Sequence, residues 1–128
     1  MAKICDMLDS ATITSVTGLS AGVGQEAKGN SGSGLTAIGH CLWGKPSTGT
    51  GVEITAFAET PFKAFFSGTP AMTPISGVGL AAKGSTNTIG GVVHAGLYVD
   101  FGTFGMLVTT DSPTATLAMS AALANAIK

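Results

Sequence analysis

The chain has 128 residues, and half of them are Gly, Ala, Thr or Ser. Six Lys and seven acidic residues give a formal net charge of -1, and there is no Arg. A chain of this length with 45% hydrophobic residues fits one globular domain over residues 1–128, and this composition argues against intrinsic disorder. The lack of a basic field argues against a dedicated nucleic-acid-binding protein.

Charged residues interrupt the first ten positions, so we expect no secretory signal peptide. The longest uncharged run, residues 64–82, contains two Pro and three Gly and is not expected to form a membrane-spanning segment. These features predict synthesis in the cytoplasm. Cys5 and Cys41 are therefore expected to be free, buried thiols, with one disulfide between them as the alternative.

Short segments that are β-branched or alternate in polarity predict strands along most of the chain. In chain order these segments are residues 12–16, 35–43, 52–57, 75–82, 89–99 and 104–110. Clusters of Gly, Ser, Thr and Asn predict turns or loops at residues 29–34, 47–51 and 84–87. The pattern predicts a mainly β (β-rich α+β) fold with about seven short antiparallel strands, arranged as a sheet, sandwich or barrel.

An Ala-rich helix is predicted at the C-terminus. Ser112 supplies a capping hydroxyl, Pro113 suits the first helical position, and the helix is expected over residues 114–128. A helix of this length is marginal alone, so it should dock on the sheet or on a neighbouring subunit. Five of its apolar residues are candidates for self-association: Leu117, Ala121, Ala122, Leu123 and Ile127. Thr60-Pro61 predicts a second, shorter helix through Phe65.

A possible internal repeat is visible at an offset of 55 residues. Residues 22–29 read GVGQEAKG and residues 77–84 read GVGLAAKG, and the alignment continues over 22–55 and 77–110. The repeat predicts a duplicated strand-rich unit of about 55 residues in which a helix closes each half. Chance identity in a sequence of such low diversity is the alternative.

Chemical motifs are scarce. The Gly-rich stretches match neither a phosphate-binding loop nor a dinucleotide loop, so no cofactor is expected. His40, Cys41 and His94 are the residues that a small cytoplasmic enzyme or binding module would use, with Cys41 and His94 as a possible nucleophile and base. His40 and Cys41 point to opposite sides of a strand, and no metal-ligand spacing is present, so no metal site is expected.

The low-charge surface, rich in small residues, favours self-association of identical chains. In this respect the sequence resembles small virion proteins of bacteriophages, either coat or capsid-decorating subunits. The two strands at residues 89–99 and 104–110, followed by TTDSP and a terminal helix, are similar in order to the coat fold of single-stranded RNA phages. The resemblance implies a non-enzymatic, self-assembling virion protein whose partners are its own copies and other virion subunits.

The sequence departs from those coat proteins because it has no Arg and only six scattered Lys, so it lacks their basic genome-binding face. Specific nucleic-acid binding is therefore expected only in the coat role, and the departure favours a role on the outside of a capsid. Coat and decoration both stay open. A cellular filament or surface-layer subunit is one alternative, and the small enzyme or binding module named above is another.

Overall fold

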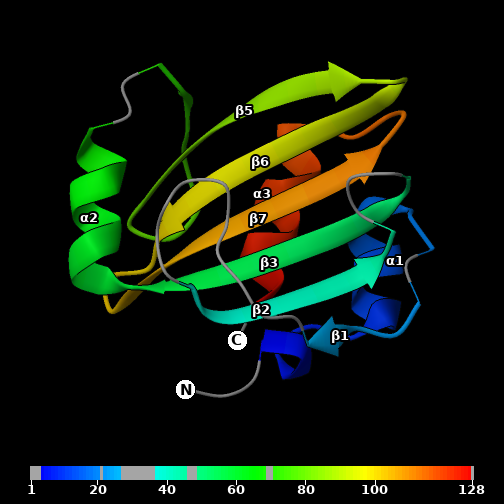
Figure 1. Ribbon diagram of the computed structural model, residues 1–128, viewed down its shortest axis with the longest axis horizontal. Helices are drawn as coiled ribbons and strands as arrows, with labels where there is room; N and C mark the ends of the chain where they lie inside the picture. Colours follow the sequence, from blue (N-terminus) through cyan, green and yellow to red (C-terminus); the bar gives the residue numbers. More distant parts are fainter. Residues whose placement is uncertain (1–3, 21, 27–36, 46–48, 69–70, 128) are drawn as a thin grey trace.

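A seven-stranded antiparallel sheet forms the centre of the computed structural model (Figure 1), which describes residues 4–20, 22–26, 37–45, 49–68 and 71–127. The strands are β1 (Gln25–Glu26), β2 (Ala37–Gly44), β3 (Gly51–Ala58), β4 (Thr73–Ile75), β5 (Ala81–Ile89), β6 (Val92–Asp100) and β7 (Phe104–Ser112). Their order across the sheet is β1-β2-β3-β7-β6-β5-β4, so β3 and β7 meet at the centre. The prediction of a mainly β fold with about seven antiparallel strands and a C-terminal helix is confirmed.

One turn of 3-10 helix and three α-helices accompany the sheet: η1 (Ile4–Asp6), α1 (Ser10–Thr17), α2 (Glu59–Ser67) and α3 (Leu117–Ala126). The strand predicted at residues 12–16 is wrong, because this segment belongs to α1. The Asp9 carboxylate accepts a hydrogen bond from the Thr12 backbone N–H at 2.7 Å, and Gly18 ends the helix at φ 75°. These two caps outweigh the β-branched composition between them. No helix in the described part of the chain is long and apolar enough to cross a membrane.

The strand predictions hold best for β2, β3, β6 and β7, whereas the region of β4 and β5 was misread. Residues 75–82 are not one strand, since β4 ends at Ile75 and β5 begins at Ala81. The turn predicted at residues 84–87 lies inside β5. The real turn is Gly90-Gly91, two residues with positive φ of 58° and 81° that join β5 to β6. Such a pair suits the tight two-residue hairpin turns that match strand twist. The loop predicted at 29–34 lies outside the described residues, as do residues 47 and 48 of the one predicted at 47–51, whereas residues 49 and 50 form a bend before β3 begins at Gly51.

The C-terminal helix begins later than predicted. β7 continues through Ser112, which pairs with Val93 of β6. The helix starts at Leu117, and the Thr116 hydroxyl caps it by accepting from the Met119 backbone N–H at 3.3 Å. The cross-strand hydrogen bonds of β7 outweigh the local capping signal at Ser112. The short helix predicted from Thr60-Pro61 is confirmed as α2.

The main core lies between the sheet and the helices α1, α3 and η1. Alternate residues of the central strands, among them Ile54, Leu97 and Val108, are fully buried there with Leu123 of α3 and Ile4 of η1. In Figure 1 α3 crosses behind the central strands, and α2 stands at one end of the sheet. The helix α3 docks on its own sheet through contacts with β5, β6 and β7. Burial of these apolar side chains, worth about 1.5–3 kcal/mol each, stabilises the two-layer arrangement.

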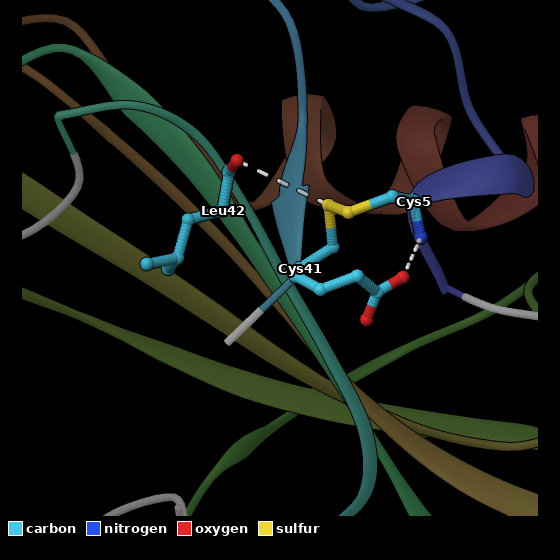
Figure 2. The surroundings of a disulfide bond; sticks show 4 residues. Cys5, Cys41 and Leu42 are labelled. Carbon is cyan, nitrogen blue, oxygen red and sulfur yellow. Dashed lines mark hydrogen bonds between the residues drawn. A yellow bond between two sulfur atoms is a disulfide. The ribbon is translucent and has the colours of Figure 1, made fainter. Parts of the chain in front are cut away.

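A disulfide joins Cys5 of η1 to Cys41 of β2, with a Cα–Cα distance of 5.3 Å (Figure 2). The prediction of two free thiols is therefore wrong. It rested on the expected compartment, whereas the fold places η1 against β2 and brings the two Cβ atoms within bonding reach. Cys41 is fully buried in the core cluster beside Trp43. The bond ties the N-terminal segment to the sheet.

The duplicated unit is not shown by the structure. An offset of 55 aligns Trp43 with Tyr98, but these residues lie on opposite faces of the sheet. Trp43 lies in the core beneath the helices, and Tyr98 contacts Phe62 and Phe65 of α2 on the other face. The alignment therefore pairs residues with different environments.

Candidate functional site on the open face of the sheet

The two faces of the sheet are covered differently. The helices α1, α3 and η1 cover one face, and α2 covers only one end of the other, where Phe62 stacks on Phe57. We call this second, partly covered side the open face. Cross-strand register places a set of polar residues on it: His40, Glu53, Ser85, His94, Thr109 and Asp111. The open face thus carries this set of polar residues beside the aromatic contacts of α2, whereas the opposite face carries the main core.

Both histidines of the chain pair with carboxylates on this face. His94 of β6 lies directly opposite Asp111 of β7, and the His94 Nδ1 is 2.8 Å from the Asp111 Oδ1. The Asp111 side chain is only 2% exposed and the His94 side chain 20%. An ionised carboxylate can only accept, so the Nδ1 of His94 donates and carries the ring proton. In the neutral imidazole the Nε2 atom is then left as a hydrogen-bond acceptor.

The second pair joins two neighbouring strands of the other half of the sheet. The His40 Nε2 of β2 is 2.5 Å from the Glu53 Oε2 of β3. Here the Nε2 atom is the one engaged, and the Glu53 side chain is 29% exposed. Both strands hold the pair by regular antiparallel register, in which His40 lies opposite Thr55. Of the two histidines, only His94 has its Nε2 outside the carboxylate contact.

Cys41 is not part of this arrangement. Its side chain belongs to the core face and its sulfur is bonded to Cys5, so it cannot serve as a nucleophile for His94. The structure therefore brings each histidine to a carboxylate that sequence reasoning missed. The sequence contains only a weak signal for these histidine–carboxylate pairs, because the pairing depends on strand register rather than on spacing along the chain. Within the described ranges, no three His, Cys, Asp or Glu side chains are grouped so as to hold a metal ion.

Two of the cavities formed by the described residues border the sheet. The larger, about 610 Å³, lies beside η1 and α1 and is lined by Cys5, Asp9 and Trp43 among others. The Asp9 carboxylate is engaged in capping α1. The smaller, about 510 Å³, lies on the open face between α2 and strands β5 to β7, and His94 lines it. Of these two cavities, the smaller is the one lined by a histidine.

The five candidate residues for self-association all lie on or beside α3. Leu123 is fully buried in the chain's own core, and Leu117, Ala121 and Ile127 pack against that core partly exposed. Ala122 is also partly exposed. The docking of α3 on its own sheet accounts for the apolar side of the helix. A role of these residues between subunits stays a prediction.

Comparisons with protein-family models, with curated proteins and with solved structures find no match to this chain.

Proposed function

We propose that the protein is a self-assembling structural subunit of a virion, a capsid coat or capsid-decorating protein, and that it has no catalytic role. The observation that carries the proposal is the outer edge of β5. Strand β4 pairs only with residues Ala82, Lys83 and Gly84 of β5. The rest of β5, residues 85–89, pairs with β6 on one side and with no strand of the described chain on the other.

This edge lacks the features that normally prevent strands of different molecules from pairing. Residues 85–89 read STNTI, are all exposed, and contain no charge and no Pro. Proteins that stay monomeric commonly protect an edge with Lys, Pro, a bulge or a covering loop. Strand β4, by contrast, is three residues long and contains Pro74. The unprotected segment is therefore suited to pair with a strand of another molecule.

A second copy of the chain is the partner that fits. The segment is uncharged, so two copies meet without like-charge repulsion, and antiparallel pairing about Asn87 is compatible with two-fold symmetry. The exposed Ile89 side chain, 63% accessible, becomes buried in such a contact. Pairing would extend one sheet across two subunits. Repeated contacts of identical chains are the basis of capsid lattices, which is why the proposal names a virion protein.

The charges of the open face are consistent with a role that involves no specific nucleic-acid binding. Glu53 and Asp111 lie on this face, and the nearby Lys83 Nζ is 4.5 Å from the centre of the Phe66 ring. Phosphate backbones are bound by several cations that release counterions together. Glu53, Asp111 and Lys83 provide no such set of cations.

Sedimentation of edge variants tests the proposal. Thr86 and Thr88 are exposed residues of the β5 edge, and the double change Thr86→Lys with Thr88→Lys places two like charges where two copies would meet. We expect the parent to sediment as an assembly and the double variant as a 12.6 kDa species. Thr103→Lys, at an exposed position between β6 and β7, is the matched control and should assemble like the parent.

Electron microscopy of the parent assembly separates the roles. Closed shells would support a coat protein, and small rings or trimers a decorating protein. A parent that remains monomeric at high concentration, or an edge variant that assembles as the parent does, would contradict assembly through β5. Open filaments would contradict the virion assignment and favour a filament subunit instead.

A further inference from the structure

The cavity on the open face has the dimensions of a small-molecule site. Its volume is about 510 Å³, and it lies between α2 and strands β5 to β7. Ligand cavities of known proteins are about 300–1,000 Å³ and combine apolar walls with a few polar groups. The chemistry of the lining therefore decides what could bind.

One wall is aromatic. Phe65 of α2 and Tyr98 of β6 both line the cavity, and their ring centres are 5.1 Å apart with an interplanar angle of 53°. Met72 and Leu107 add further apolar surface. Aromatic side chains favour contact with another ring, in stacked or edge-to-face geometry. This wall is suited to a planar, apolar group.

The polar part of the lining carries no fixed charge. Ser85, Asn87, Thr109 and His94 line it, and none of the described lining residues is Lys, Asp or Glu. A charged ligand would lose its hydration on entering the cavity and would find no opposite charge there, which costs free energy. The composition therefore favours an uncharged ligand.

His94 supplies the directional contact. Its Nδ1 lies 2.8 Å from the buried carboxylate of Asp111, and in the tautomer that donates from Nδ1 the ring presents Nε2 as a hydrogen-bond acceptor. A group held in place by a second hydrogen bond loses little freedom when it binds a ligand. The matching ligand group is an O–H or N–H donor.

We propose that this cavity binds a small, uncharged aromatic molecule that carries a hydroxyl or amino donor, with His94 Nε2 accepting the donor's hydrogen bond and the Phe65 and Tyr98 side of the cavity contacting the ring. Asp111 is a positioning residue for His94. The inference adds a ligand to the proposed structural role and does not depend on assembly through β5.

Gly96 makes it possible to block the cavity without disturbing the fold. It lies in the lining beside His94, and a Cβ atom added there would have only Leu107 Cδ1 at 3.7 Å and Thr109 Oγ1 at 3.8 Å as its nearest neighbours. These are ordinary van der Waals distances. The Cβ atom of Gly96→Val is therefore accommodated, and its two γ-methyl groups add bulk to the wall of the cavity that Gly96 lines.

Phenol is the probe, and toluene is the matched ligand that lacks the donor. Binding is measured by ligand-observed saturation-transfer NMR, which is suited to both monomers and assemblies. We expect phenol to bind with a dissociation constant on the order of 1 mM and about three- to tenfold more tightly than toluene, as one net hydrogen bond allows. His94→Ala should bring phenol to the level of toluene and leave toluene unchanged.

Two further variants complete the test. Gly96→Val should remove the binding of both ligands, and His40→Ala, which alters the other histidine of the open face, should change neither. The inference is overturned if the parent does not bind phenol, if toluene binds as tightly as phenol, or if Gly96→Val binds both ligands as the parent does. Circular dichroism and urea unfolding of each variant show whether it is folded, so a loss of binding counts only for a folded protein.

Discussion

Reduction of the disulfide between Cys5 and Cys41 should lower the stability of the protein substantially. The bond closes a loop over a sequence separation of 36 residues. In the chain-entropy model, a loop of this length restricts the unfolded chain by about 13 cal/mol/K, which corresponds to about 4 kcal/mol at 25 °C. Reduction keeps both sulfur atoms in the protein, so it removes the cross-link without leaving a cavity beside the buried Cys41.

Urea unfolding with and without a phosphine reductant measures this effect. Trp43 is the sole tryptophan, is 1% exposed and lies in the same core cluster as Cys41, so its fluorescence reports the transition. With an m-value of about 2 kcal/mol/M, a loss of about 4 kcal/mol moves the midpoint down by about 2 M. The variant Cys5→Ser has no cross-link to lose and controls for direct effects of the reductant.

Two results would refute this reasoning. Mass spectrometry of protein purified under oxidising conditions should show the mass of a closed disulfide. Two thiols that react with an alkylating reagent would show that the disulfide is not formed. A closed disulfide whose reduction shifts the midpoint by less than about 0.5 M would show that the unfolded chain is already compact around this loop.

Two further predictions concern a glycine contact and a helix cap. A Cβ at Gly105 would overlap the ring of Phe62, so Gly105→Ala should lower the free energy of unfolding in urea by roughly 1–3 kcal/mol. The control Gly96→Ala should lower it by less than about 1 kcal/mol. Equal losses in the two variants would contradict the close packing of Phe62 of α2 on Gly105. The backbone hydrogen bond from Thr12 lowers the pKa of Asp9 below its usual 3.8. The ionised Asp9 carboxylate therefore stabilises the folded protein above pH 3.8, and this stabilisation is lost as the pH falls through the lower pKa of the folded state. Asp9→Ala should therefore melt below the parent at neutral pH and together with it near about pH 2, and a constant difference would exclude the carboxylate as the cause.

The sequence predicted elements best where hydrophobic periodicity and tertiary burial agree. In β3, Val52, Ile54 and Ala56 face the core, and the alternation is visible in the letters. The prediction from sequence failed where local and tertiary preferences differ. Ser112 has the side chain of a helix cap, yet cross-strand pairing with Val93 keeps it in β7. Gly84 begins a segment whose composition is typical of a turn, yet it lies in β5 beneath Leu117, and a Cβ atom there would overlap the Leu117 side chain.

The candidate site was predictable only in part. His40 and His94 were identified because histidines are rare in this chain, but their partners Glu53 and Asp111 were not. Which carboxylate lies beside a histidine depends on the register between strands, and a shift of one residue would move each side chain to the other face. The disulfide was missed for a different reason, since the expected compartment says nothing about how close two residues lie in the fold.

The position of β3 at the centre of the sheet has a consequence for the order in which the molecule folds. Strands β5 and β6 are joined by two glycines, so their pairing closes a very short loop. Ile54 of β3, by contrast, lies opposite Val108 of β7, 54 residues further along the chain. Closing a long loop costs more chain entropy and slows folding. We therefore expect the β5–β6–β7 meander to form first as a local nucleus and the docking of β2 and β3 against β7 to follow as the slower step.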